Sequence, residues 1–519
     1  MIGTAELATA VEQALAYLSA QPDIRESEVF AAANGALLAR INYTSHIPCN
    51  GVEEPKSTES HGLGIQVVLD TPAGPLLGFG SEPSDLSIDG VERALGKARR
   101  AAVADPEFVS LPHSSSEQRT LWTYHDPRLF DVRDEELVQT GWRVVQGGVR
   151  AFQTSSRLAA LAAGESGLRA LGLILGGDVT ILQERIAIAT SHLPRVQTDE
   201  STLLMAAVTA MVEAHGAKGS GWWTGTRLDD FTDQAALDAA AGAISAVDGD
   251  RVPSGEYRVI LGKQPVADLL NNIVIPACTA GSIYSQSSPF LGKLGRRVAV
   301  PQLTIYDHGA IPGFMGSKGI TCEGLPTGRT DLIRDGVFVG CLSSWYESQR
   351  LLRDPKLTEK LGGAPAAARS ALVPRNGFRF DAGGGRQFDS PPGVSPSNVI
   401  VEGSEPVPLT ELLRSVDHGL YIGRIWYTYP INGLRAGDFT CTVIGDSYLI
   451  RDGRLAAPIK ANTLRINDNI SRVLGNIVGI AKDPKGTIVW AADEVAYTPE
   501  IACTAIHVEA IAGYMEELA

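Results

Sequence analysis

The sequence predicts an α+β protein: an N-terminal α/β region of antiparallel sheets covered by helices, followed by a β-rich C-terminal domain. Up to about residue 250, segments with the apolar spacing of helices alternate with strand-like segments. After that point, short strand-like segments separated by turns predominate. The 519 residues are enough for two or three domains. We expect domains at 1–250, with two sub-repeats at about 1–106 and 107–250, and at 251–519.

The first sub-repeat is expected to be a small sheet between two helices. An amphipathic helix over about 4–20 precedes residues 27–43, whose alternation and Asn34-Gly35 dipeptide predict two strands joined by a type I′ turn. Residues 61–82 predict two further strands around a Pro-Ala-Gly turn. The helix predicted over 86–105 ends before Pro106.

The second sub-repeat has the same character. Residues 133–152 and 233–248 have the spacing of amphipathic helices. The segments 157–173 and 178–192 between them are expected to form strand hairpins. The turn-rich sequence GDRVPSG at 249–255 marks the boundary to the C-terminal domain.

The C-terminal domain is predicted to consist mainly of short strands. Asp-Gly pairs at 335–336 and 452–453 predict hairpin turns between two pairs of them. The segment 362–398 is dense in Gly, Pro and Ala and is expected to be a long surface loop. The predicted strands are EYRVILG, VAVPQLTIYD, DLIRDGVFVG, YLIRDGRLAAPIK, GTIVWAADE and EIACTAIHVEAIAG.

Composition argues against nucleic acid and membranes as partners. The formal net charge is −14, whereas a phosphate backbone requires a basic face. The basic stretch at 93–102 is interpreted as a solvated helix face. The sequence contains neither 18 consecutive apolar residues nor a signal-peptide pattern. Its six cysteines form no CxxC pair and no disulfide framework, so we expect a cytoplasmic protein.

Several segments of the C-terminal half resemble those of one family in content and order. They are a strand ending in Pro at 295–301, the turn TIYDH at 304–308, EGLPTGRT at 323–330 and LIRDG at 332–336. The closing stretch at 434–464 contains GDFT followed by IRDG and PIK. This ordered set is similar to the TldD/TldE proteins, also called PmbA or "modulator of DNA gyrase".

The resemblance implies an N-terminal α/β part, a β-rich C-terminal part and cytoplasmic pairs of subunits around an internal cavity. In this family, TldD-type subunits carry the motif H-E-x-x-x-H on a helix, bind a metal with both His and a later Cys, and cleave peptides. TldE-type subunits share the frame without the motif and pair with TldD.

The motif positions fall on Asn271, Asn272 and Pro276 in the stretch PVADLLNNIVIPAC that begins at Pro265. Neutral amides are poor zinc ligands, and neither can act as a general base near pH 7. Pro276 should end or kink the helix. No His-Glu dipeptide occurs in the chain, and the late segment VLGNIVGIAKDPKGTIVW has no Cys. We therefore expect no metal here, with zinc only in a partner subunit.

Other polar and aromatic residues are weaker candidates for a cavity or peptide site. Asp307 and His308, with Glu323, form the best polar cluster, although a capping Asp and an exposed His would explain the first two. Cys278 and Cys322 are expected to be small buried side chains rather than nucleophiles.

Two aromatic stretches leave binding and packing roles open. Trp222-Trp223 would line a peptide groove or pack at a domain junction. The turn that starts at Trp426, with Tyr427 and Tyr429, would face a ligand or a second subunit.

Three functions remain open. The first is a TldE-like subunit without metal that completes a cavity and holds an extended peptide for a TldD-like homologue, as a heterodimer, or otherwise as a homodimer. The second is an enzyme of its own with new chemistry in the cavity, acting in peptide or natural-product maturation. The third is a modulator of gyrase or nucleic acid, which the charge of −14 disfavours.

Overall fold

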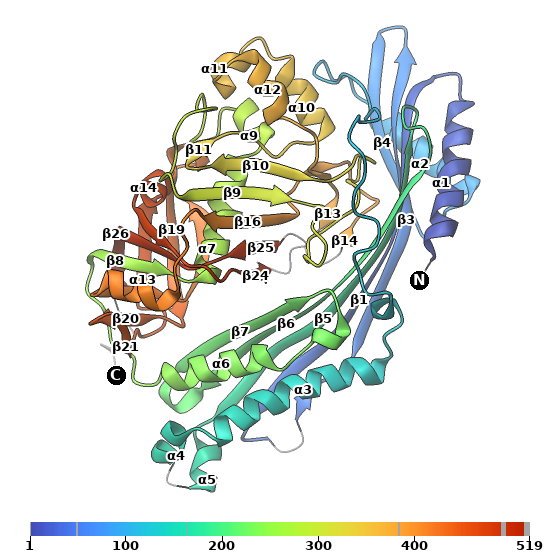
Figure 1. Cartoon of the computed structure of the whole chain (residues 1–519). Coiled ribbons are helices and arrows are strands. Elements are labelled where there is room, and N and C mark those ends of the chain that lie inside the picture. The colour runs from blue at the N-terminus through green and yellow to red at the C-terminus, as the bar shows by residue number, and fades with distance from the viewer. Residues whose placement is uncertain (1, 48–49, 163, 382–384, 489–494, 513–519) are drawn as a thin grey trace.

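The computed structural model describes residues 2–47, 50–162, 164–381, 385–488 and 495–512. A long curved sheet from the N-terminal half lies against a C-terminal part that is built mainly from a six-stranded and a nine-stranded sheet, as Figure 1 shows. This arrangement confirms the predicted α+β class, with antiparallel sheets and a β-rich C-terminal part. The division at residue 250 stays a prediction.

The N-terminal sheet is antiparallel throughout, in the order β4-β3-β1-β5-β6-β7, with β2 paired to β1. Its strands are β1 (Ile24–Thr44), β2 (Gly51–Val52), β3 (Lys56–Thr71), β4 (Gly74–Pro83), β5 (Leu173–Thr190), β6 (Gln197–Val212) and β7 (Ala217–Gly225). The helices of this half are α1 (Thr4–Ser19), α2 (Ile88–Ala101), η1 (Pro127–Phe130), α3 (Asp134–Gln153), α4 (Ser156–Ala162), α5 (Glu165–Ala170), η2 (Glu213–His215), η3 (Leu228–Asp230) and α6 (Gln234–Ser245).

Alternation along β1 separates the two faces of this sheet. Val29 and Ala31 pack with α1 in one core, whereas Phe30 and Ala32 pack against Ile320 and other C-terminal side chains. The helices α1, α2, α3 and α6 thus cover one face, and the C-terminal part faces the other (Figure 1).

Glycines allow helices to lie close to both edges of the sheet. A Cβ on Gly221 in β7 would lie 2.0 Å from the carbonyl oxygen of Ala235 in α6. A Cβ on Gly80 in β4 would lie 2.2 Å from that of Ala94 in α2. Glycine is therefore required where each small-residue helix crosses its strand.

The C-terminal part contains a six-stranded and a nine-stranded sheet, in which the parallel strand pairs among the described residues are β16–β25 and β8–β17. The six-stranded order is β11-β10-β9-β16-β25-β24, with β9 (Leu303–His308), β10 (Arg329–Arg334), β11 (Val337–Phe338), β16 (Asn398–Gly403), β24 (Lys485–Ile488) and β25 (Val495–Thr498). The nine-stranded order is β18-β19-β22-β26-β8-β17-β20-β21 with β23 on β26, comprising β8 (Gly255–Leu261), β17 (Gly419–Ile422), β18 (Arg424–Pro430), β19 (Asp438–Gly445), β20 (Tyr448–Arg451), β21 (Arg454–Pro458), β22 (Leu464–Asn469), β23 (Ile477–Ile480) and β26 (Ile501–Ala510).

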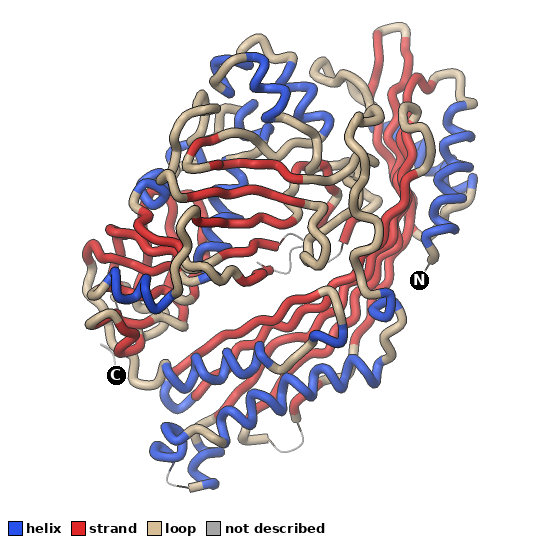
Figure 2. The backbone as a smooth tube through the Cα atoms, in the orientation of Figure 1, coloured by secondary structure: helices blue, strands red, loops and turns tan. Residues whose placement is uncertain are grey.

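Short helices and strands connect these sheets, as the secondary-structure colouring of Figure 2 shows. The helices are α7 (Lys263–Leu269), the π-helical turn η4 (Leu270–Val274), α8 (Ile275–Ala277), α9 (Ala280–Tyr284), α10 (Trp345–Leu352), α11 (Leu357–Leu361), α12 (Pro365–Ala371), α13 (Leu409–Val416), η5 (Leu434–Ala436) and α14 (Ile470–Gly475). Two-residue strands form the pairs β12 (Gly377–Phe378) with β15 (Gly393–Val394) and β13 (Phe380–Asp381) with β14 (Gly385–Arg386). The described residues include no helix long and apolar enough to cross a membrane.

Three local predictions are wrong. β1 continues through Asn34 and Gly35 without a turn, because it is hydrogen-bonded to β3 on one side and β5 on the other. Residues 157–173 contain helices α4 and α5 rather than a hairpin, and Leu158 and Ala162 of α4 are buried one turn apart. Residues 178–192 belong mostly to the single long strand β5 rather than to a hairpin.

The segment 362–398 was expected at the surface, and this is also wrong for its central part. Arg379 and Arg386 lie fully buried against the N-terminal sheet. Arg386 pairs with Glu184 and Asp199, at 2.9 and 3.0 Å. Glycine and proline allow the close turns here, but buried charge pairs fix the segment.

The predicted helices and Asp-Gly turns are confirmed elsewhere. The helices expected near 4–20, 86–105, 133–152 and 233–248 are α1, α2, α3 and α6. The hairpins β10–β11 and β20–β21 turn at 335–336 and 452–453. The strand predicted at 486–494 is described only as far as Ile488, where β24 ends.

Candidate functional site

A cavity of about 400 Å³ lies between the N-terminal sheet and the C-terminal part. A second cavity of about 310 Å³ adjoins it, and Thr209, Arg424 and Trp426 line both. Strands β5, β6 and β7 form the floor of the first cavity, and α7 and β18 supply its opposite wall. The site therefore depends on contacts between the two halves of the chain.

Strand alternation determines which side chains form the floor. Val179, Ala206 and Ala217 point into the core beneath the helices. Their neighbours on the other face therefore point toward the cavity. These are Gly176, Asp178, Thr180, Met205, Ala207, Thr209, Ser220, Trp222 and Thr224.

Helix α7 brings a buried carboxyl group, Asp268, to the cavity. Asn272, one turn later, donates from Nδ2 to the backbone carbonyl oxygen of Asp268 at 2.9 Å. The same nitrogen lies 3.2 Å from the carboxylate oxygen Oδ1 of Asp268 and donates to it as well. Thr428 of β18 donates to Oδ2. Burial raises the pKa of Asp268 to about 6, although these donors and the nearby Arg424 oppose the shift.

An irregularity in β18 aims Thr428 inward. The pairing of β18 with β19 shifts between Trp426 and Tyr429, and Tyr427 has φ +55°. A bulge of this kind re-aims side chains locally. Thr428 is consequently buried beside Asp268, whereas Tyr427 and Tyr429 are 71% and 54% exposed.

Asp446 and Arg424 are two of the charged side chains that line the second cavity. Asp446, with φ +50°, follows β19 and accepts hydrogen bonds from the Ser220 backbone N–H at 3.1 Å and from the Ser220 hydroxyl. Burial raises the pKa of Asp446 to about 6. Burial lowers the pKa of Arg424, and Asp446 and Asp268 oppose that shift. These three charged groups interact across the cavity.

The three tryptophans singled out from the sequence lie in three different surroundings. Trp222 lines the cavity, donates from Nε1 to the Gly486 carbonyl at 3.0 Å and lies under the Lys485 ammonium at 4.3 Å. It thus contributes both to the cavity and to the junction with β24. Trp223 packs edge-to-face on Phe231. Trp426 lines both cavities.

The motif positions lie on the same helix as Asp268. Asn271 and Asn272 belong to the π-helical turn η4, and helix α8 ends at Ala277, one residue after Pro276. The prediction that Pro276 ends the helix is therefore confirmed. Such π turns often occur at functional sites. On this helix, the cavity-lining residues are Gln264 and Asp268.

The predicted cluster of Asp307, His308 and Glu323 lies in the six-stranded half. Asp307 is buried and accepts hydrogen bonds from Asn376 and Ser397, and burial raises its pKa to about 6. His308 is half-buried and accepts from the Ala310 backbone N–H at 3.2 Å. These contacts hold Asn376 and Ser397 against β9, and Asp307 and His308 are not among the residues that line the cavities.

Glu323 occupies a separate buried position. Both carboxylate oxygens lie 2.9 Å from the Trp345 backbone nitrogen, which donates to them. Burial raises the pKa of Glu323 to about 8.

Cys278 and Cys322 are also buried, and burial raises the pKa of each thiol, for Cys322 to about 12. This agrees with their interpretation as small buried side chains.

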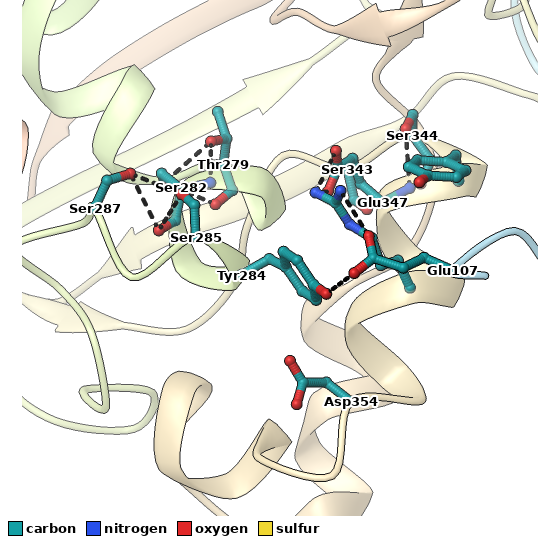
Figure 3. Close-up of polar contacts among 12 residues, drawn as sticks. Glu107, Thr279, Ser282, Tyr284, Ser285, Ser287, Ser343, Ser344, Glu347 and Asp354 are labelled. Carbon is teal, nitrogen blue, oxygen red and sulfur yellow. Dashed lines mark hydrogen bonds and ion pairs between the residues drawn. The ribbon is translucent and has the colours of Figure 1, made fainter. Parts of the chain in front are cut away.

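A further polar cluster, shown in Figure 3, anchors the segment between α2 and η1. Tyr284 of α9 donates to Glu107, and Arg350 pairs with Glu107 at 3.3 Å and Glu347 at 2.6 Å. The Arg350 guanidinium lies 4.0 Å from the centre of the Tyr284 ring. These contacts hold the connecting segment to α9 and α10.

The residues at the motif positions do not fit a catalytic metal. Asn272 uses its amide on Asp268, and Pro276 has no ligand atom in its side chain. Within the described residues, three groups that could share an ion occur together at Asp417, His418 and Asp452, all exposed. His418 lies 3.1 and 3.7 Å from the two carboxylates, as expected of surface ion pairs.

Sequence reasoning singled out Trp426 and Trp222 but missed Asp268, Arg424, Asp446 and Ser220. Ser220 and Asp446 are 226 residues apart, so no local motif connects them. The cavity floor could have been inferred from the sequence through the alternation of polar and small residues along β5, β6 and β7.

The chain is similar to known metallopeptidase-like proteins. Residues 254–510 match the family model described as PmbA/TldA metallopeptidase C-terminal domain. The metalloprotease slr0863 of Synechocystis is 27% identical over 307 residues, which are 58% of this chain and 59% of that protein. A metalloprotease TldD homolog of Haemophilus influenzae is 25% identical over 234 residues, or 44% of this chain and 42% of that one. The matched stretches span about half the length of these relatives.

The solved structure of TldE from Thermococcus kodakarensis has the same overall fold. The TM-score is 0.74 at 17% identity, and the superposition covers 96% of this chain and 100% of that one. At this identity the likeness concerns the fold. It extends over both halves of the molecule and therefore includes the part that precedes residue 254.

Proposed function

Since residues 254–510 belong to the PmbA/TldA metallopeptidase C-terminal domain family, we propose that this chain is a TldE-like subunit that holds an extended peptide and carries no catalytic metal. The proposal rests mainly on one observation: the Asn272 amide donates hydrogen bonds to Asp268, on the helix where the resemblance places the metal motif. The metal, in this proposal zinc, belongs to a TldD-like partner.

The chemistry of the helix supports this assignment. A zinc hydrolase needs imidazole, carboxylate or thiolate ligands and a base that takes a proton from the bound water. Asn271, Asn272 and Pro276 supply none of these groups. Asp268 is the carboxyl group of this helix that reaches the cavity, and Thr428 and Asn272 already hold it.

The geometry suits an extended peptide. The cavity floor has small side chains at Gly176 and Ala207, which leave room for a main chain. β7 is an edge strand of the N-terminal sheet, and β18 is an edge strand of the nine-stranded sheet. Edge strands bind extended peptides through main-chain hydrogen bonds with little dependence on sequence.

The partner surface is proposed to include the exposed turn of β18. Tyr427, Tyr429 and Ile431 are exposed there. Exposed aromatic side chains on an edge strand are typical of an interface. Trp426, by contrast, lines the cavity, so the tyrosines are the better probes of assembly. The partner is a metal-bearing homologue, or otherwise a second copy of this chain.

The test is reconstitution with the metal-bearing homologue of the same organism. We expect the mixture to cleave an unstructured peptide in a chelator-sensitive manner, while this chain alone, with added Zn²⁺, does not. Tyr429→Glu should weaken both assembly, measured by light scattering, and cleavage. Leu455→Glu, at an exposed position of the opposite edge strand β21, is the matched control. Chelator-sensitive cleavage by this chain alone would contradict the proposal.

One observation favours the alternative of an independent enzyme. Asp268 and Asp446 face the cavities with pKa values raised to about 6, in the range of a general acid or base. That alternative predicts chelator-insensitive turnover by the chain alone, abolished by Asp268→Asn.

A further inference from the structure

Among the described residues, Arg424 and Lys218 are charged side chains of the cavities without a direct partner, and Arg424 lines both cavities. Its guanidinium forms no hydrogen bond and no ion pair with any residue among those that the structure describes. It interacts electrostatically with Asp268 and Asp446, but neither forms an ion pair with it. Burial lowers its pKa, so it is substantially desolvated. A desolvated cation of this kind is unfavourable until an anion reaches it.

The neighbouring carboxylates are satisfied by other groups. Asp268 accepts from Asn272 and Thr428, and Asp446 accepts from Ser220. Asp178 of the cavity floor pairs with Arg40 at 3.2 Å. These contacts keep the carboxylates in place, and they leave the Arg424 guanidinium available to a ligand.

The position of Arg424 gives a ligand access from two sides. Arg424 lines both the 400 Å³ and the 310 Å³ cavity, as Trp426 does. Lys218 lines the second cavity and adds a positive charge. A planar guanidinium binds a carboxylate through two parallel hydrogen bonds, which gives directional recognition that an ammonium lacks.

We propose that Arg424 anchors the peptide by binding one of its carboxylates, either the C-terminal carboxylate or an acidic side chain. This inference rests on the proposed peptide-holding function and adds a chemical preference to it. The main chain would lie over the small residues of the floor, and the carboxylate would meet the guanidinium where the two cavities join. Arg424 is therefore a specificity residue and not part of a catalytic step.

The experiment measures binding of four fluorescently labelled peptides of one neutral sequence to the full chain. One peptide has a free C-terminal carboxylate, and one has a C-terminal amide. The other two are amidated and carry a single central Glu or Gln. We expect at least one carboxylate peptide to bind about tenfold more tightly than its neutral counterpart. The free-acid pair and the Glu/Gln pair distinguish the two sources of the carboxylate.

Three variants test the residue. Arg424→Gln should remove the preference while retaining weak binding, because the main-chain contacts remain. Arg424→Lys should keep the charge and restore part of the preference. Arg435→Gln changes an exposed arginine of η5 and should leave the preference intact. Melting temperatures of the variants show whether each chain is folded.

The outcomes separate the two proposals. Binding of all four peptides with equal affinity, unaffected by Arg424→Gln, would overturn the carboxylate anchor while leaving peptide holding intact. Carboxylate preference that survives in Arg424→Gln would also overturn the role of Arg424. Failure of every peptide to bind the folded chain would contradict both.

Discussion

Two groups of buried charges lie on the same face of the N-terminal sheet, and they differ in how the charges are paired. At one, Arg386 contacts Glu184 and Asp199, Lys318 contacts Glu184 at 2.7 Å, and Arg119 contacts Asp199 at 2.7 Å. At the other, Asp268, Arg424 and Asp446 interact at a distance around a cavity. Direct pairing holds the C-terminal half to the sheet, whereas spaced charges leave room for a ligand.

The largest expected effect is on the paired group. Arg386→Met would remove the cation that Glu184 and Asp199 share and leave each with one remaining cation, and we expect a loss of about 3–5 kcal/mol in the free energy of unfolding. Urea denaturation measures it. A loss below about 1 kcal/mol would mean that Lys318 and Arg119 suffice to hold these carboxylates, and would weaken the contrast between the two groups.

Glu323 offers an intermediate case, since it is buried with backbone donors at hydrogen-bond distance. Burial raises the pKa of Glu323 in the folded chain to about 8, above the ordinary value of 4.5 for a glutamate. The contribution of protonated Glu323 to the free energy of unfolding is fully present below about pH 4.5 and is lost as the pH rises through about 8. Glu323→Gln should therefore flatten this dependence, with a change on the order of a few kcal/mol in relative stability between pH 5 and pH 8.

Thermal or urea unfolding at several pH values measures the effect. Glu402→Gln, which changes an exposed glutamate, is the control and should leave the pH dependence as it is in the unsubstituted chain. An identical pH dependence for Glu323→Gln and the unsubstituted chain would show that Glu323 ionises at its ordinary pKa in the folded state.

The smallest expected effect on stability is at Arg424. Because its guanidinium is desolvated without a direct partner, Arg424→Gln should change the free energy of unfolding by less than about 1 kcal/mol, or increase it. The same denaturation measurement as for Arg386→Met provides the comparison. A loss as large as that of Arg386→Met would show that Arg424 is a structural residue and that the two groups do not differ.

Local patterns predicted much of the fold. Long periodic segments identified α1, α2, α3 and α6, and Asp-Gly pairs identified two hairpin turns. The Asn34-Gly35 signal failed because β3 and β5 hydrogen-bond to both sides of β1, so tertiary pairing overrides the local turn preference. The Gly-rich segment around Arg386 was misjudged because its buried ion pairs involve residues about 200 positions away in the sequence.

The candidate site was predicted only in part, for the same reason. That residues 263–277 contain no His and no Glu was readable from the sequence, because the composition of one helix is local information. Asp268, Arg424 and Asp446 carry no shared motif, and they meet only when β18 and β19 pack against α7 and β7. Charges that act across a cavity are therefore apparent from the structure and not from the sequence.

The proposal that this chain carries no catalytic metal of its own can be examined through the zinc content of the purified chain. The purified chain would be incubated with excess Zn²⁺, dialysed and examined by elemental analysis. We expect well below one zinc per chain, because the Asn272 amide is hydrogen-bonded to Asp268 and the side chain of Pro276 offers no ligand atom. About one tightly bound zinc per chain, retained after dialysis, would contradict it.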